Sequence, residues 1–164
     1  EYVVLGRSAR IGLSSSPGKN DWILAQKALE EVGIAHLSRR LCSEVSGGQL
    51  QLAAIARALA NDPELLILDE PESNLDFRNQ ALILEVIDRL TEQGPGVILN
   101  THFPAHALSR AKSGLLVPRG EAPVFAPASE IFTEEALSRL FGIDVKIRTL
   151  QFGPKTLPVV AALP

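Results

Sequence analysis

A Ser-Gly-Gly turn before a predicted helix is the first group of residues that could do chemistry. Ser46, Gly47 and Gly48 precede a helical pattern over residues 49–60. The first N–H groups of a helix have no partner within it, and the helix dipole is positive at that end. An anion, most plausibly a phosphate, would bind there. Taken alone, such a Gly-Gly pair is more often a structural turn.

Two adjacent carboxylates form a second candidate group. Asp69 and Glu70 follow the apolar run 65–68, whose lack of polar alternation predicts a strand buried on both faces. A second apolar run, 97–99, predicts another buried parallel strand that ends shortly before His102. Ligands of open α/β sheets bind at the carboxyl ends of strands. We therefore expect Glu70 and His102 at one sheet edge, although a carboxylate pair can equally cap a helix and a lone histidine is more often structural.

Four motifs occur in a fixed order between residues 45 and 102. They are VSGGQ at 45–49, LLILDEP at 65–71, SNLD at 73–76 and the pair Thr101-His102. In this order they resemble the signature motif, Walker B motif, D-loop and switch histidine of ATP-binding cassette (ABC) ATPases. Residues 1–12 and 126–147 resemble segments of the ATPases of iron–siderophore, haem and cobalamin importers. The resemblance implies an ABC transporter ATP-binding subunit, nearest to that importer group.

This resemblance also implies roles for single residues in ATP hydrolysis with Mg²⁺. Asp69 would hold the metal or its water, Glu70 would orient and deprotonate the attacking water, and His102 would contact the γ-phosphate. The signature turn, Ser46–Gln49, would act on ATP held by a second ATPase subunit, so that each site is complete only in a head-to-tail dimer. Asp76 would connect the two sites.

Several positions depart from the family pattern. Glu72 stands where threonine is usual, Leu50 and Leu52 occupy positions that are often basic, and Asn100 stands where threonine is common. We expect none of these residues to touch the catalytic atoms. These departures therefore make the assignment to a particular group within the family less certain than the assignment of ATP hydrolysis.

The phosphate-binding loop of the family is missing from the sequence. No G-x-x-x-x-G-K-[ST] stretch occurs, and the nearest candidate, which ends at Lys19, lacks the first glycine and is followed by Asn20. The chain also begins with Glu1 and contains no methionine. We therefore expect a piece of a longer protein that is inactive by itself. In the family, the strand leading into the missing loop lies between the strands expected at 97–99 and 115–117, so these two strands should face a gap.

Composition excludes several classes of protein. The chain has 164 residues, of which 46% are hydrophobic, which suits one globular domain. The net charge is −3, and the arginines, read as solvated surface, form no basic stripe, so no nucleic-acid partner is expected. These arginines are Arg7, Arg10, Arg39 and Arg40. A single cysteine, Cys42, permits no internal disulfide and fits a reducing compartment.

Local signals predict several element ends. Asp21 can cap a helix that carries Trp22 and Ala25 on its apolar face and stops at Gly33. Gly6, within the Leu-Gly-Arg triplet that resembles the importer ATPases, could also simply end a helix. Further predictions are a strand at 115–117, a turn at Arg119-Gly120, a helix from Thr133 to Gly142, a half-buried strand from Ile143, and a terminal hairpin that turns at Gly153-Pro154.

The sequence thus predicts an α/β fold, the carboxyl-terminal portion of a P-loop NTPase with a mostly parallel sheet. Residues 1–60 would form the helical signature subdomain, and residues 61–164 the Walker B half of a RecA-like catalytic core with a C-terminal extension. The expected function is ATP hydrolysis that powers an importer of an iron chelate, haem or cobalamin. The subunit would be cytoplasmic and held at the membrane by transmembrane permease subunits, because no run of the chain can span a bilayer.

Two other classes of function stay open. One is a non-transport ABC ATPase that works on DNA or ribosomes. The acidic balance and the lack of a coiled-coil insertion between Arg7 and Ser46 count against it. The other is a non-catalytic fragment that serves in docking or regulation. Co-purification with a polytopic membrane protein would separate transport from both.

Overall fold

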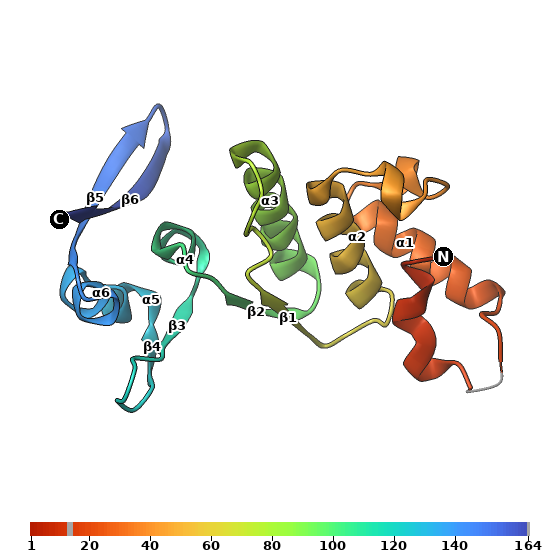
Figure 1. The fold of residues 1–164 in the computed structure, drawn as a ribbon, viewed down its shortest axis with the longest axis horizontal. Coiled ribbons are helices and arrows are strands. Elements are labelled where there is room, and N and C mark those ends of the chain that lie inside the picture. Colours follow the sequence, from red (N-terminus) through yellow and green to blue (C-terminus); the bar gives the residue numbers. More distant parts are fainter. Residues whose placement is uncertain (13–14, 164) are drawn as a thin grey trace. The chain divides into compact units, whose positions relative to one another are not determined.

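The computed structural model describes residues 1–12 and 15–163, in two compact units, Glu1–Asn100 and Thr101–Pro164 (Figure 1). The first unit contains η1 (Val4–Arg10), α1 (Lys19–Glu31), η2 (Ala35–Leu37), η3 (Cys42–Glu44), α2 (Gly47–Leu59), β1 (Leu65–Asp69), α3 (Phe77–Gln93) and β2 (Gly96–Asn100). The second contains α4 (Pro104–Arg110), β3 (Ser113–Leu116), β4 (Val124–Pro127), α5 (Ala128–Ile131), α6 (Glu134–Phe141), β5 (Asp144–Phe152) and β6 (Lys155–Leu163). No helix among the described residues is long and apolar enough to cross a membrane.

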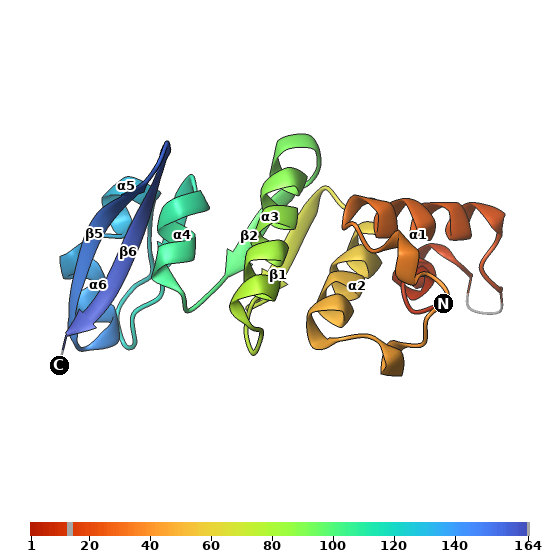
Figure 2. The same ribbon diagram turned by 90° about the horizontal axis from the view of Figure 1, so that it is seen from above.

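The core of the first unit lies where α1, α2, α3 and η1 meet the inner face of β1. In α2 the buried apolar side chains recur at helical spacing, at Leu52, Ile55, Ala56 and Leu59. Ile83 of α3 is also fully buried and belongs to the same cluster. This shared cluster sets the positions of the first turns of α2 and α3, which carry the candidate site (Figure 2).

The described strands form three two-stranded sheets, β1–β2, β3–β4 and β5–β6. Only β1–β2 is parallel, with Leu65 opposite Gly96 and Asp69 opposite Asn100. The other two pairs are antiparallel. The mixture of helices and strands confirms the α/β class, while the parallel part of the sheet is limited to this one pair.

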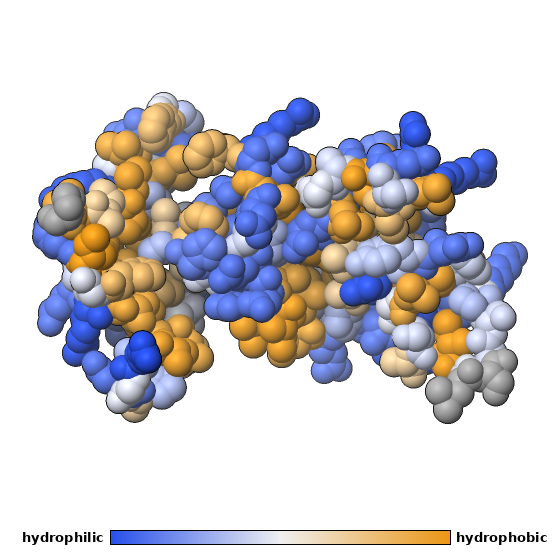
Figure 3. Space-filling view, in the orientation of Figure 1, coloured by the Kyte–Doolittle hydropathy of each residue, from blue (hydrophilic) through white to orange (hydrophobic). Residues whose placement is uncertain are grey.

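The prediction that β1 is buried on both faces was wrong. Leu66 and Leu68 are buried, whereas Leu65 and Ile67 are 50% and 67% exposed. The strand at 97–99 was also predicted to be buried, yet β2 is partly open and Ile98 is 51% exposed. The core cluster contacts one face of these strands, and hydrophobic side chains gather on the surface over β1 and β2 (Figure 3). An unbroken run of apolar residues in the sequence therefore does not show that both faces of the strand are buried.

Arg7 is part of the core rather than solvated surface, so its sequence reading was wrong. Its side chain is buried, and its Nε donates to Asp21 Oδ1 at 3.0 Å while Nη1 donates to the carbonyl of Ala60 at 3.3 Å. Asp21 is not the cap of α1, because the N-cap is Gly18, whose N–H donates to the Asp21 carboxylate at 2.9 Å. That N–H, together with the Arg7 guanidinium, lowers the pKa of Asp21.

Gly6 allows the close approach that buries Arg7. It lies inside η1 rather than at the end of a helix. A Cβ atom at this position would stand 1.8 Å from the carbonyl oxygen of Arg57 in α2. Only glycine therefore lets η1 lie this close to the backbone of α2.

Local signals placed several element ends of the second unit correctly. Thr133 caps α6 by accepting the N–H of Ala136 at 3.1 Å, and Gly142 ends the helix with φ of +68°. Gly153, with φ of +59°, forms the turn of the β5–β6 hairpin. The predicted turn at Gly120 is also present, and the strand predicted at 115–117 is β3, Ser113–Leu116, which pairs with β4.

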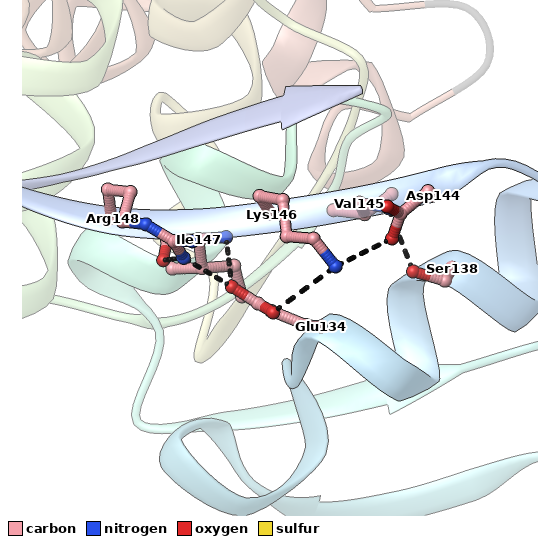
Figure 4. A network of polar contacts seen from close by, with 7 residues as sticks. All are labelled: Glu134, Ser138, Asp144, Val145, Lys146, Ile147 and Arg148. Carbon is pink, nitrogen blue, oxygen red and sulfur yellow. Dashed lines mark hydrogen bonds and ion pairs between the residues drawn. The ribbon is translucent and has the colours of Figure 1, made fainter. Parts of the chain in front are cut away.

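A polar network joins α6 to β5 (Figure 4). Glu134 Oε1 accepts from the N–H of Ile147 at 2.8 Å and from Nη1 of Arg148 at 2.7 Å. Lys146 lies between Glu134 and Asp144, with its Nζ 3.8 Å and 2.8 Å from their carboxylate oxygens. The Ile147 N–H is the main cause of a lowered pKa of Glu134, with Arg148 and Lys146 adding to it.

This network predicts an acid-sensitive contribution to stability. Because the folded pKa of Glu134 is lowered, its contribution is present above the unfolded pKa and is lost as the pH falls through the folded pKa. We expect Glu134→Gln to be less stable than wild type near neutral pH, with a difference that shrinks in acid. Urea unfolding of both proteins over a pH series measures this. A difference that stays constant down to strongly acidic pH would refute the assignment.

Candidate functional site

The predicted signature turn forms the start of α2. Ser46 is the N-cap, and its Oγ accepts the N–H of Gln49 at 3.3 Å. In return, Gln49 Oε1 accepts the N–H of Ser46 at 2.9 Å, which completes a reciprocal capping box. The N–H groups of Gly47 and Gly48 lie in the first turn, which has no preceding helical carbonyls. This end of α2 can therefore present N–H groups to an anion.

The start of α3 packs directly against this turn. Asp76 is the N-cap of α3, and its two carboxylate oxygens accept from the backbone N–H and the side-chain amide of Asn79, at 2.8 and 3.0 Å. A Cβ atom added to Gly48 would lie 2.6 Å from Cγ of Asn79, and one added to Gly47 would lie 3.9 Å from Leu75. The structure thus brings the predicted signature and D-loop residues side by side. Sequence reasoning missed Asn79, whose contact with Gly48 depends on how two helices pack.

A cavity of about 420 Å³ opens between these two helix starts. Ser46 and Gln49 line it from α2, and Asp76, Asn79 and Arg78 line it from the start of α3. The remaining lining residues are Val32, Gly33, Ile34, His36, Leu52, Leu82, Glu85 and Arg89. Two helix starts therefore border one cavity, which is lined by both polar and apolar side chains.

The carboxyl ends of β1 and β2 hold the candidate metal ligand. Asn100 Nδ2 donates to Asp69 Oδ1 at 2.5 Å, and the Glu70 N–H donates to the carbonyl of Asn100 at 2.9 Å. The expectation that Asn100 touches no catalytic atom was therefore wrong. Parallel register places Asn100 opposite Asp69, and this pairing is the signal that would have revealed the contact.

The backbone turns sharply at Glu70. Its φ of +43° lies in the left-handed region, which costs a non-glycine residue about 1 kcal/mol or more. The next two residues, Pro71 and Glu72, are buried, and Glu72 is 0% exposed. Ser73 then returns to Glu70, with its Oγ donating to Oε2 at 2.8 Å and its N–H to the carbonyl at 3.0 Å. The exposed carboxylate of Glu70 is thus attached to a loop that is anchored in the core.

His102 belongs to the second unit, Thr101–Pro164. Its ring lies against that of Phe103, with ring centroids 4.2 Å apart. The N–H of Phe103 is bound by Oγ1 of Thr101 at 3.0 Å. The predicted common edge for His102 and Glu70 stays a prediction, because these residues lie in different units.

The described carboxylates fit Mg²⁺ better than a metal held by protein alone. The described residues contain no cluster of three or more His, Cys, Asp or Glu side chains that could hold a metal ion. Mg²⁺ is commonly held by one or two carboxylates, with waters and substrate phosphates completing its octahedron. Asp69, exposed at a strand end and oriented by an amide donor, matches that donor set.

Comparison with known proteins shows what this chain is similar to. Residues 40–105, which include every candidate site residue, match the family described as "AAA domain, putative AbiEii toxin, Type IV TA system". The molybdate import ATP-binding protein MolC of Haemophilus influenzae is 35% identical over 153 residues, covering 93% of this chain and 60% of that protein. The chain is homologous to ABC transporter ATP-binding proteins.

Two further ABC proteins support this assignment. The iron(3+)-hydroxamate import ATP-binding protein FhuC of Bacillus subtilis is 39% identical over 123 residues, covering 74% of this chain and 46% of that protein. A solved structure titled "An inward-facing conformation of a putative metal-chelate type ABC transporter" superposes with a TM-score of 0.94 at 32% identity, covering 99% of this chain and 65% of that chain. The ABC ATPase fold predicted from the motifs is thereby confirmed. The chain spans about half the length of the curated ABC relatives that it matches.

Proposed function

We propose that this chain supplies the signature, Walker B, D-loop and switch-histidine portion of an ATP-hydrolysing subunit that powers an ABC importer. The observation that carries the proposal is the packing of Gly48 against Asn79, which puts the signature turn beside the start of α3. A helix start with available N–H groups, next to Asp76, suits a surface that contacts a nucleotide held by a second subunit. We refer below to the complete subunit, meaning this chain together with a phosphate-binding loop.

In the proposed mechanism the residues of this chain divide the work. Asp69 would hold Mg²⁺ or its water, and the metal would supply positive charge that offsets the charge on the transferring phosphate. Glu70 orients the attacking water and accepts its proton, and His102 contacts the γ-phosphate. Ser46–Gln49 presents hydroxyl and N–H groups to the γ-phosphate on the second subunit, and Asp76 connects the two sites. We also propose that residues 1–60 form the helical signature subdomain and residues 61–164 the Walker B half of the catalytic core.

The cargo is proposed to be a metal or a metal chelate. Relatives are named for molybdate, manganese and iron(3+)-hydroxamate import, and the superposed structure is titled for a metal chelate. An iron chelate, haem or cobalamin remains our specific proposal. The subunit would sit on the cytoplasmic face of the membrane, bound to permease subunits.

The experiment that tests this function is co-purification of the complete subunit with its membrane partner. A polytopic membrane protein should co-purify, and ATP hydrolysis by the complex should respond to metal-chelate cargo. Co-purification with ribosomes or DNA instead would favour the non-transport alternative. A rate of ATP hydrolysis that does not change with any metal or metal chelate tested would contradict the importer proposal.

The isolated chain is predicted to be inactive. It contains no phosphate-binding loop, and Leu65, Ile67 and Ile98 leave an apolar strand surface exposed. We expect the 164-residue chain to show no hydrolysis and no appreciable Mg-ATP binding by calorimetry, and to associate when its size is measured by light scattering. A compact monomer that binds Mg-ATP with micromolar affinity would overturn this prediction.

A further inference from the structure

Ser73 makes two hydrogen bonds to the residue proposed as the general base. Its hydroxyl donates to Oε2 of Glu70 at 2.8 Å, a usual length for an O–H···O bond. Its backbone N–H donates to the carbonyl of the same residue at 3.0 Å. An ionised carboxylate can only accept, so the hydroxyl must be the donor. Ser73 therefore forms hydrogen bonds to both the main chain and the side chain of Glu70.

The loop that carries Ser73 is well anchored. Glu70 and Asn74 both have left-handed backbones, with φ of +43° and +59°, which surrounding contacts must enforce. The Glu70 N–H continues the hydrogen bonding to β2 through the carbonyl of Asn100 at 2.9 Å. Glu72, between Glu70 and Ser73, is fully buried. The hydroxyl of Ser73 thus acts from a fixed point.

The side chain of Glu70 itself is exposed, so burial does not select its rotamer. A catalytic group must be held close to its working geometry, and a misplacement of about 1 Å can cost about 10²-fold in rate. A hydrogen bond from an anchored hydroxyl can supply the restraint that burial does not.

We propose that Ser73 is a positioning residue that holds the carboxylate of Glu70 in the orientation used for hydrolysis. The proposal rests on the proposed function, because it assumes that Glu70 is the general base. Through this hydrogen bond Ser73 would set the direction of the base.

The test compares Ser73→Ala with Ser73→Thr in the complete subunit. The alanine variant should lose about 10- to 100-fold in kcat with little change in KM for ATP. Threonine keeps a hydroxyl and should restore most of the rate. Ser109→Ala is the matched control, because Ser109 Oγ also donates to a residue three positions earlier, the carbonyl of His106. It should leave kcat and KM unchanged.

A double-variant cycle guards against a simple folding defect. In the Glu70→Gln background, Ser73→Ala should cause little further loss, because it acts through a carboxylate that is already absent. A full additional loss in that background would show that Ser73 acts elsewhere. If Ser73→Ala keeps the wild-type kcat while Glu70→Gln is inactive, only the positioning role fails. If Glu70→Gln itself hydrolyses ATP normally, the proposed function fails.

Discussion

Replacing Glu70 with glutamine should lower turnover of the complete subunit by about 10²–10⁴-fold while ATP binding stays nearly intact. Glutamine has almost the same shape and can still accept the hydrogen bond from Ser73, so the loop after β1 should be preserved. What it lacks is the ability to take a proton from the attacking water. Steady-state hydrolysis and equilibrium ATP binding, measured on the same preparation, separate the two effects.

The same variant should accumulate as an ATP-bound dimer, because hydrolysis no longer resolves it. Glu64→Gln provides the matched control, since Glu64 is an exposed glutamate that immediately precedes the same strand. That control should hydrolyse ATP at the wild-type rate and should not accumulate as a dimer. Turnover of Glu70→Gln within a few-fold of wild type would rule out Glu70 as the general base.

Gly48→Asp should abolish ATP-driven dimerisation and hydrolysis but leave the ATP affinity of a single subunit almost unchanged. An aspartate would place a negative charge at the start of α2, where a phosphate is proposed to approach. Its Cβ would also lie 2.6 Å from Cγ of Asn79, so Asn79 must move. Light scattering with and without Mg-ATP measures the dimer, and calorimetry measures affinity.

Gly48→Ala separates the two causes, because it introduces the Cβ without the charge. We expect it to weaken dimerisation less than aspartate does, by an amount that reports the clash with Asn79 alone. An aspartate variant that lost affinity as a single subunit yet still dimerised would show that the signature assignment is wrong.

Sequence reasoning succeeded where the deciding interactions are local. Thr133 and Gly142 bracket α6 because a cap and a left-handed residue act within one helical turn. It failed where distant segments decide the outcome. The buried side chain of Arg7 donates a hydrogen bond to the carbonyl of Ala60, 53 positions away in the sequence. Leu65 and Ile67 are exposed because the burial of a strand depends on which other segments pack against it.

The candidate site shows the same division. Motif order located Asp69 and Glu70, but not the contacts that orient them. Asn100 was treated as a departure from the family pattern, although the register of β1 and β2 sets its amide against Asp69. Ser73 reaches Glu70 where the backbone of Glu70 is left-handed, a conformation that the local propensity of glutamate does not predict.

Mixing two inactive variants tests the central claim most directly, that the signature turn serves ATP held by a second subunit. In a mixed dimer of Glu70→Gln and Gly48→Asp subunits, one of the two sites would combine an intact Glu70 with an intact signature turn. We expect the equimolar mixture to recover hydrolysis, up to about a quarter of the wild-type rate, because random pairing would make about half of the dimers mixed and each mixed dimer has one complete site. The control mixes wild type with the double variant, whose mixed dimers have no complete site and should add nothing. A mixture of single variants that stays as inactive as its components, or mixed dimers of the control that hydrolyse ATP, would contradict the account.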